Sequence, residues 1–416
     1  MITKWQWTLL QFARKLWVRA TLIGLFAVAV ALAGLLGERL IPADLPAKIG
    51  ADAVESILSI LASSMLAVTT FSLSVMVAAY SAATTSVTPR ATKLLMQDAT
   101  TQNTLAVFIG SFLFSLVSIV ALSAGAYGES GRLILFVATL AVILLIVITI
   151  LRWIEHLTRL GRVGETTDRV ERSAAHAIRE RASQPYLGGH PLRDAAKDLP
   201  ASALPVYAAT IGYVQHIDMR GLAELAERTS GRVFVAALPG SFVHGAQPIA
   251  YVESALDEPC RARLRDAFIV GNERSFDQDP RFGLSVLAEI ASRALSPALN
   301  DPGTAIDVIG RGVRLLSLWT ACREADAASV PEHPRIWVPP LALADLFDDI
   351  FAPIARDGAA NLEVQSRLQK ACRALAEIGG EAFAAEAERL SRRAMAFAET
   401  AMALDSEKTV LRRITL

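Results

Sequence analysis

The chain has 416 residues, of which 53% are hydrophobic and 20% are charged. Its 41 lysines and arginines balance its 41 aspartates and glutamates, and no basic run stands out, so the composition argues against nucleic acid as a partner. The hydrophobic excess lies almost wholly before residue 155. This asymmetry predicts a membrane domain followed by a soluble domain, because a spanning helix needs about 20 apolar residues.

The membrane domain is expected within residues 1–155, where four apolar stretches are long enough to cross a bilayer. A basic start and the triplet at 31–33 imitate a cleavable signal peptide, but the apolar core is longer than such signals have, and we favour an uncleaved span. The second stretch exceeds the bilayer thickness and ends before Pro89. The predicted spans are residues 17–37, 56–85, 104–124 and 133–153.

Basic residues near the spans predict the orientation, because lysine and arginine are retained on the cytoplasmic side. They gather before the first span, in the second loop and after the fourth span. The remaining loops hold only Arg39, Lys48 and Arg132, so both termini are expected in the cytoplasm. Tryptophans at the same ends of the spans are expected to anchor the protein at the membrane interface: Trp5, Trp7, Trp17 and Trp153.

Small residues recur along one face of the second stretch at the three- and four-residue spacing of a helix. Such a stripe faces protein or water rather than lipid, so it predicts either close packing against a neighbouring helix or the lining of an aqueous path. The stripe consists of Ser56, Ser59, Ser63, Ala67, Thr70, Ser74, Ala78 and Ser81.

The soluble region is predicted to have a mixed α+β fold in three parts. Residues 156–204 read as a stalk helix, which extends span four, and a linker; residues 205–255 read as a small β-rich subdomain with a barrel-like piece. Residues 256–416 read as a helical subdomain, in which an apolar stripe from Phe383 to Leu404 predicts burial in the domain core or in an oligomeric seam. No cofactor is expected, because the hairpin of the β-rich piece carries no lysine at its tip. No metal is expected either, because His216 and His244 lack nearby cysteine or carboxylate partners.

The segment from Asn272 to Ile309 is the densest in polar residues, and part of its pattern is helix capping. Asp279 and Asp301 each precede a proline, which predicts two N-caps on helices joined by the turn SPALND. The acidic residues also leave open a divalent cation site, and we expect Asp301 to pair with Arg293, but the structural interpretation is favoured over the cation. The polar cluster comprises Arg274, Asp277, Gln278, Asp279, Arg293, Ser296, Asn300, Asp301 and Thr304.

This segment carries a resemblance to a known family. The string QDPRFGLSVLAEIASRALSPALNDPGTA, together with Arg274 and the upstream PGSFVHGAQPIAYVE, resembles the signature of the bacterial membrane proteins called domain of unknown function 2254. The second span and its following loop are also similar to that family, and only Ser275 departs, where threonine is expected. The resemblance implies a multi-pass protein of the bacterial inner membrane, and it implies no activity.

The sequence leaves two functional hypotheses. No phosphate-binding loop, paired-histidine metalloprotease motif or serine elbow is present, so no enzyme is expected. We favour a homo-oligomeric, channel-like protein with the second span near the central axis and a cytoplasmic sensing or gating domain. No charge lies deep in a span, which argues against a coupled transporter. The alternative is a membrane-anchored regulatory or scaffold protein whose soluble domain binds a partner or a small ligand. The expected partners are thus the lipid bilayer, other copies of the chain and an unidentified ion or ligand.

Overall fold

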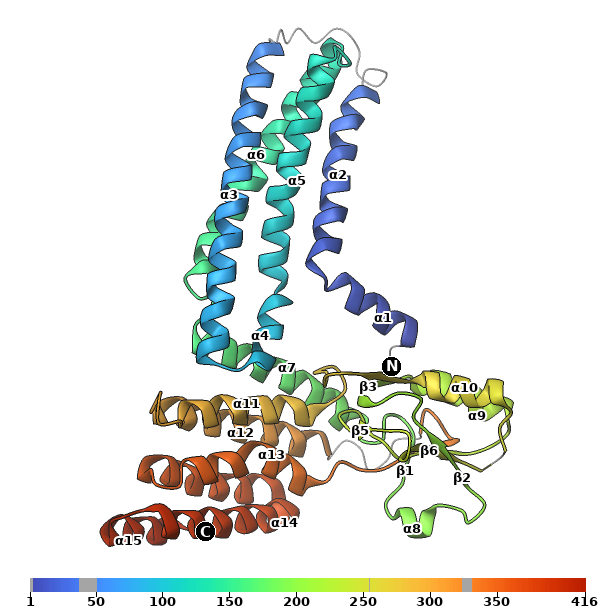
Figure 1. Cartoon of the computed structure of the whole chain (residues 1–416), viewed down its shortest axis with the longest axis vertical. Helices are drawn as coiled ribbons and strands as arrows, with labels where there is room; N and C mark the ends of the chain where they lie inside the picture. Colours follow the sequence, from blue (N-terminus) through green and yellow to red (C-terminus); the bar gives the residue numbers. More distant parts are fainter. Residues whose placement is uncertain (1–2, 37–50, 254, 324–330) are drawn as a thin grey trace. The chain divides into compact units, whose positions relative to one another are not determined.

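The computed structural model describes residues 3–36, 51–253, 255–323 and 331–416 (Figure 1). The chain divides into two compact units. The membrane unit comprises Thr8–Thr85 and Thr92–Thr166, and the C-terminal unit comprises Met1–Trp7, Ser86–Ala91 and Thr167–Leu416. Two short segments from the first quarter of the chain therefore belong to the C-terminal unit.

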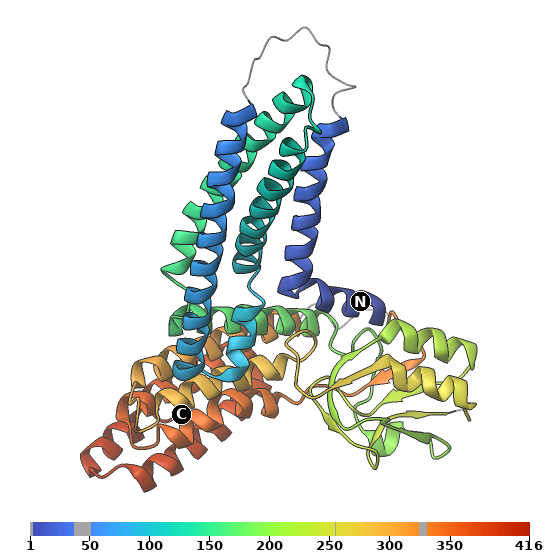
Figure 2. The same cartoon turned by 45° about the horizontal axis from the view of Figure 1, so that its top comes forward.

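The four predicted spans are confirmed as helices that are long and apolar enough to cross a membrane. They are α2 (Leu16–Leu36), α3 (Ala51–Ser86), α5 (Ala99–Ser123) and α6 (Glu129–Leu157), and they run alongside one another in both views (Figures 1 and 2). Helix α1 (Lys4–Ala13) precedes them, and α4 (Pro89–Met96) begins at the proline expected to end span two. Residue 37, at the predicted end of span one, and the loop residues Arg39 and Lys48 lie outside the described residues.

Small residues bring α2 and α5 into close contact within the membrane unit. A Cβ atom on Gly24 would lie 2.9 Å from Leu113 Cδ1, and one on Gly110 would lie 3.0 Å from Ile23 Cγ2. Larger side chains at these two positions would force the helices apart. The close packing that small residues permit is therefore present between α2 and α5.

The predicted stalk is interrupted rather than continuous with span four. Helix α6 ends at Leu157, and α7 (Val163–Ser183) begins after a turn in which Gly161 has a φ of +80°. A left-handed residue breaks the helical hydrogen-bond ladder, and glycine adopts this conformation without strain. Residues of α7 spaced four apart are buried: Val170, Ala174 and Ile178.

The β strands form two sheets in the C-terminal unit. The five-stranded sheet has the order β1 (His190–Pro191), β8 (Ile336–Val338), β4 (Val233–Val235), β6 (Pro248–Val252) and β2 (Leu204–Tyr207). The three-stranded sheet has the order β5 (Phe242–Val243), β3 (Gly212–Ile217) and β7 (Phe268–Gly271). Strand β8 pairs in parallel with both β1 and β4, and the other pairings are antiparallel.

Both sheets are open, so the predicted barrel-like piece is wrong. A hairpin in the segment around Pro239 and Gly245 would pair β5 with β6. Instead β5 pairs with β3, whereas β6 pairs with β2 and β4. The chain thus passes from one sheet to the other between Val243 and Pro248. The β-rich part also draws on β7 and β8, which lie beyond residue 255.

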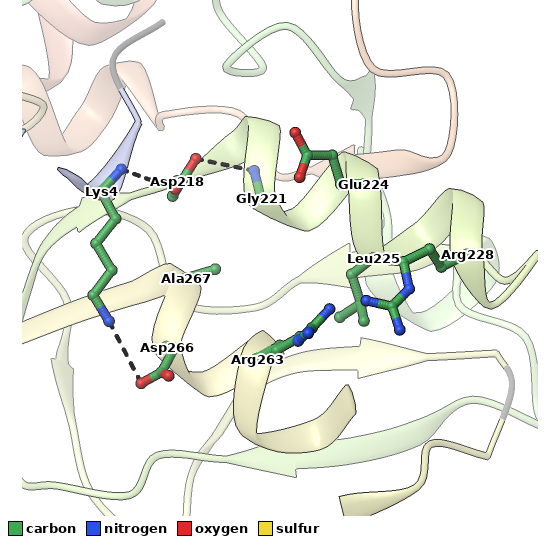
Figure 3. Close-up of a pocket in the computed structure, with 9 residues that line it drawn as sticks. All are labelled: Lys4, Asp218, Gly221, Glu224, Leu225, Arg228, Arg263, Asp266 and Ala267. Carbon is green, nitrogen blue, oxygen red and sulfur yellow. Dashed lines mark hydrogen bonds and ion pairs between the residues drawn. The ribbon is translucent and has the colours of Figure 1, made fainter. Parts of the chain in front are cut away.

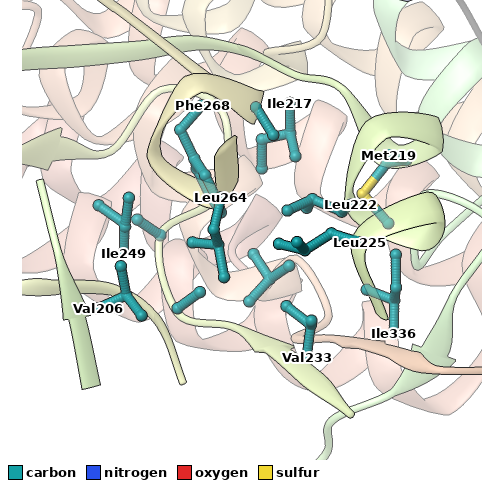
Figure 4. Close-up of a cluster of buried hydrophobic side chains, with 14 of the residues drawn as sticks. Val206, Ile217, Met219, Leu222, Leu225, Val233, Ile249, Leu264, Phe268 and Ile336 are labelled. Atoms are coloured by element: carbon teal, nitrogen blue, oxygen red, sulfur yellow. The ribbon is translucent and has the colours of Figure 1, made fainter. Parts of the chain in front are cut away.

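Helices α9 (Met219–Arg228) and α10 (Glu258–Ala267) complete the core of the β-rich part, and a short helix, α8 (Ala195–Asp198), precedes β2. Leu222 and Leu225 of α9 and Leu264 of α10 are buried against strand residues such as Val233 and Ile249 (Figure 4). Each fully buried leucine stabilises the fold by about 1.5–3 kcal/mol relative to an exposed one.

The remaining helices are α11 (Pro280–Ala294), α12 (Pro302–Arg323), α13 (Leu343–Asp357), α14 (Leu362–Ala401) and α15 (Asp405–Ile414). Gly380, with a φ of +69°, kinks α14. Beyond the kink, Phe383 is buried with its ring 5.5 Å from that of Phe347 on α13. The predicted apolar stripe is buried at Ala387, Leu390 and Ala394, and it becomes exposed at Ala401 and Leu404.

Candidate functional site

All eight stripe positions of α3 are exposed in the single chain. The structure assigns Ser56, Ser59, Ser63, Ala67, Thr70, Ser74, Ala78 and Ser81 to the exposed class. The buried face of α3 is a different one, and it carries Val54, Leu58, Met65 and Met76. The stripe therefore lies on the exposed face of α3, opposite the face that is buried in its own chain.

Three stripe hydroxyls donate hydrogen bonds to carbonyl groups of their own helix. Ser63 Oγ lies 3.0 Å from the Ser59 carbonyl oxygen, Thr70 Oγ1 lies 2.9 Å from that of Leu66, and Ser74 Oγ lies 3.0 Å from that of Thr70. Their donor capacity is thus satisfied without water or a partner, and each oxygen still has a lone pair to accept a hydrogen bond.

Two polar contacts inside the membrane unit were not predicted. Trp153, expected at the interface, is 3% exposed and donates its indole N–H to Ser72 Oγ at 3.0 Å. At the start of α5, the carboxylate of Asp98 caps the helix through the Thr101 N–H and lies 3.0 Å from His156 Nε2. Both contacts join helices of the four-span unit.

The polar cluster of residues 274–304 divides into two groups at opposite ends of α11. Arg274, Asp277, Gln278 and Asp279 lie at its N-terminal end, and Arg293 to Thr304 lie at or beyond its last turn. Because α11 has 15 residues at 1.5 Å each, about 20 Å separates the two ends. The acidic pair and Asp301 therefore do not form one site, and the described residues contain no group of three metal-ligating side chains.

Asp279 is the centre of the N-terminal group. Its carboxylate accepts two hydrogen bonds from Arg274, at 2.7 and 2.9 Å, and caps α11 through the Phe282 N–H at 3.2 Å. The side chain is 1% exposed. Gly240, with a φ of +91°, lies against this carboxylate, and a Cβ atom there would overlap it. The backbone between the two sheets thus leaves room for the carboxylate only because residue 240 is glycine.

Burial dominates the electrostatics of this group. It raises the pKa of Asp279, whereas Arg274 opposes that shift. Burial also lowers the pKa of the nearby Arg181 to about 10, and the charge of Asp279 counteracts this effect. Arg181 is 3% exposed, and its one hydrogen bond to a described residue is a long one, 3.4 Å to the Pro339 carbonyl. The Asp279 carboxyl group therefore lies close to the charges of two arginines, Arg274 and Arg181.

The N-terminal segment of the chain contacts the same group. Trp7 donates its indole N–H to Asp277 Oδ2 at 3.0 Å, and its ring stacks on that of the buried His216 at 5.7 Å. Next to Asp277, Gln278 accepts the backbone N–H of Ile217 in β3. Adjacent motif residues thus hold the N-terminal segment and a sheet, whereas Trp7 was expected to anchor the protein in the membrane interface.

The turn after α3 also contacts α11. Thr88 Oγ1 donates to Glu289 Oε2 at 3.0 Å, and Arg90 Nη1 lies 2.6 Å from Glu289 Oε1. Thr88 is buried. Helix α11 therefore contacts the chain segment that immediately follows the striped helix.

At the other end of α11, Asp301 acts as an N-cap. Its carboxylate accepts the backbone N–H of Thr304 at 3.1 Å and the Thr304 hydroxyl at 2.5 Å, and these hydrogen bonds lower its pKa. Asn300 adopts a φ of +47°, a conformation in which asparagine is enriched. Within the described part of the chain, Asp301 forms no ion pair with Arg293, so the geometry gives capping but not the expected pairing.

Sequence reasoning identified the motif but missed its partners: Trp7, Arg181, His216, Gly240 and Glu289. A Pro–Gly dipeptide such as Pro239–Gly240 is typical of a turn, but it carries no sign that a carboxylate lies against Gly240. The other contacts join residues far apart in the sequence, such as Trp7 and Asp277, which are 270 positions apart.

We predict that Gly240→Ala destabilises the protein by about 1–3 kcal/mol, because the added methyl group meets the Asp279 carboxylate and the backbone has a left-handed φ. Thermal unfolding of the solubilised protein measures the effect. Gly245→Ala is the matched control, since a Cβ atom there meets nothing within 4 Å. Equal thermal unfolding midpoints for Gly240→Ala and Gly245→Ala would contradict the prediction.

We also predict that Asp301→Asn is nearly neutral, because asparagine caps helices as well as aspartate does, whereas Asp301→Ala costs about 0.5–2 kcal/mol. A double-mutant cycle with Arg293→Gln, read by thermal unfolding, should be additive. A non-zero coupling free energy between residues 293 and 301 would contradict this prediction and support the ion pair.

Comparison with known proteins agrees with the resemblance noted in the sequence. Uncharacterized proteins of Mycobacterium tuberculosis and Mycobacterium bovis are 40% identical over 121 residues, which cover 26% of this chain and 22% of each relative. The matched segment thus spans about a fifth of the length of these relatives. No solved structure matches the chain. The family profile "Predicted membrane protein (DUF2254)" matches residues 13–374, and the chain therefore belongs to that family.

Proposed function

We propose that this protein is a homo-oligomeric, channel-like protein in which α3 faces the other copies near a central axis. The observation that carries the proposal is the exposure of all eight stripe positions, while the opposite face of α3 is buried in its own chain. Within one chain, close packing through small residues joins α2 to α5, whereas the stripe of α3 stays exposed.

Neighbouring copies account for the stripe better than lipid does. Alanine, serine and threonine let helix backbones approach closely, which favours helix association in a membrane. The same residues can line a narrow aqueous path, because hydroxyl oxygens whose protons are used by the helix still accept hydrogen bonds from water or coordinate a cation. Ser63, Thr70 and Ser74 have this arrangement.

The C-terminal unit is the proposed sensing or gating part. Thr88 and Arg90 follow α3 directly, and both contact Glu289 of α11. A shift of α11 would therefore displace the end of the striped helix. For orientation we propose the bacterial inner membrane with both termini in the cytoplasm, which rests on the basic residues around the spans.

The alternative is a membrane-anchored regulatory or scaffold protein without transport. One observation favours it: the C-terminal unit contains a cavity of about 210 Å³, which is large enough for a small ligand. Both functions predict a soluble region that responds to a ligand, and they differ in whether the oligomer conducts.

Single-cysteine variants of a cysteine-free protein test the channel. Cysteine at Thr70 should form disulfide cross-links between copies, whereas cysteine at Leu73, which is exposed off the stripe, should not. In liposomes, a charged water-soluble thiol reagent should modify cysteines at Ser63 and Ser74 and reduce ion flux at least severalfold. The matched control, cysteine at the exposed Leu66, should face lipid and be spared.

The subunit count of the purified protein gives the first control. A monomer, or a well-folded oligomer that carries no flux of any tested ion, would contradict the channel and support the anchored alternative.

A further inference from the structure

A pocket lies between α9 and α10 in the C-terminal unit, next to the N-terminal segment (Figure 3). It has a volume of about 210 Å³, and its floor includes the buried Leu225 and Ala267. The charged residues that line it are Lys4, Asp218, Glu224, Arg228, Arg263 and Asp266.

Each of the three carboxylates in the pocket already has a partner. Asp218 caps α9 through the Gly221 N–H and accepts the backbone N–H of Lys4 at 2.8 Å. Asp266 Oδ1 lies 3.5 Å from Lys4 Nζ. Glu224 lies 3.4 Å from the Nε of Arg220, one turn earlier on the same helix.

The two arginines differ from these residues. In the part of the chain that the structure describes, neither Arg228 nor Arg263 forms a hydrogen bond or an ion pair. The pKa of Asp257 is lowered mainly by its hydrogen bonds with Cys260, and the charge of Arg228 contributes to this shift without a direct contact. Figure 3 shows their guanidinium groups pointing toward one another from the facing helices. Two like charges that converge in a pocket repel each other, and an anion between them would turn this repulsion into attraction.

We propose that this pocket binds a phosphate group, with Arg228 and Arg263 as its donors from α9 and α10. Guanidinium groups match phosphate oxygens through paired hydrogen bonds, and two of them can enclose one phosphate from both sides. The volume leaves room for a small substituent on the phosphate. Because Lys4 lines the pocket and bonds Asp218 and Asp266, the bound group would also hold the N-terminal segment that leads into α2. The proposal does not depend on ion conduction.

The test uses the full-length protein in a nonionic detergent, which carries no phosphate, and inorganic phosphate as the probe. Phosphate should raise the thermal midpoint at constant ionic strength, since a ligand of the folded state stabilises it. Arg228→Gln and Arg263→Gln should each weaken the apparent affinity at least tenfold. Both side chains are exposed, so the variants are expected to fold. Arg261→Gln is the matched control, because Arg261 lies on α10, is 3.9 Å from Glu258 and does not line the pocket.

A second arm separates the two sources of phosphate. In nanodiscs of phosphatidylcholine with and without phosphatidylglycerol, binding of an anionic lipid headgroup would raise the thermal midpoint of the wild type when phosphatidylglycerol is present, but not that of the double variant. A response to inorganic phosphate in detergent alone would identify a soluble ligand. The proposal is overturned if the wild type responds to neither probe, or if the double variant responds as the wild type does.

Discussion

A single buried carboxylate sets the arrangement of the C-terminal unit, because a charge removed from water must be fully paired. Asp279 meets this demand with the Nε and Nη2 donors of Arg274, the first turn of α11 and the positive charge of Arg181. Several neighbours follow from it. Residue 240 must be glycine, and the loop that carries Arg274 holds Asp277 and Gln278 where they bind Trp7 and β3.

The contacts around Asp279 explain why the N-terminal part of the motif is rich in polar residues. Its side chains connect the N-terminal segment, a sheet and a helix, and each is occupied by another part of the chain. Asp279 caps helix α11, and the same helix carries Glu289, which accepts a hydrogen bond from Thr88 in the turn after α3. The interpretation of the motif as a scaffold and the proposal of a gated α3 are thus compatible, since a rigid α11 is what a gating contact requires.

Local patterns made part of the structure predictable from the sequence. Apolar length gave the four spans, and an aspartate before a proline gave the N-caps at Asp279 and Asp301, because each signal lies within a few residues. The barrel failed because strand pairing is not local: β8 enters the larger sheet from residue 336, and β5 turns away from β6. The small-residue stripe of α3 was visible in the sequence. Its exposure was not, because it depends on which face of α3 packs against α5 and α6. The contact between Trp7 and Asp277 left no signal in either residue.

Hydrogen exchange of the full-length protein with Asp279→Asn tests whether the buried carboxylate organises its neighbours in the C-terminal unit. Asparagine keeps the cap of α11 but removes the charge, so Arg274 loses its partner and the loop through Gln278 loosens. We predict faster exchange than in the wild type in residues 3–7, in β3 and in the first turn of α11 together. Unchanged exchange in residues 3–7 and β3 would contradict it, because Asp279 would then serve α11 alone.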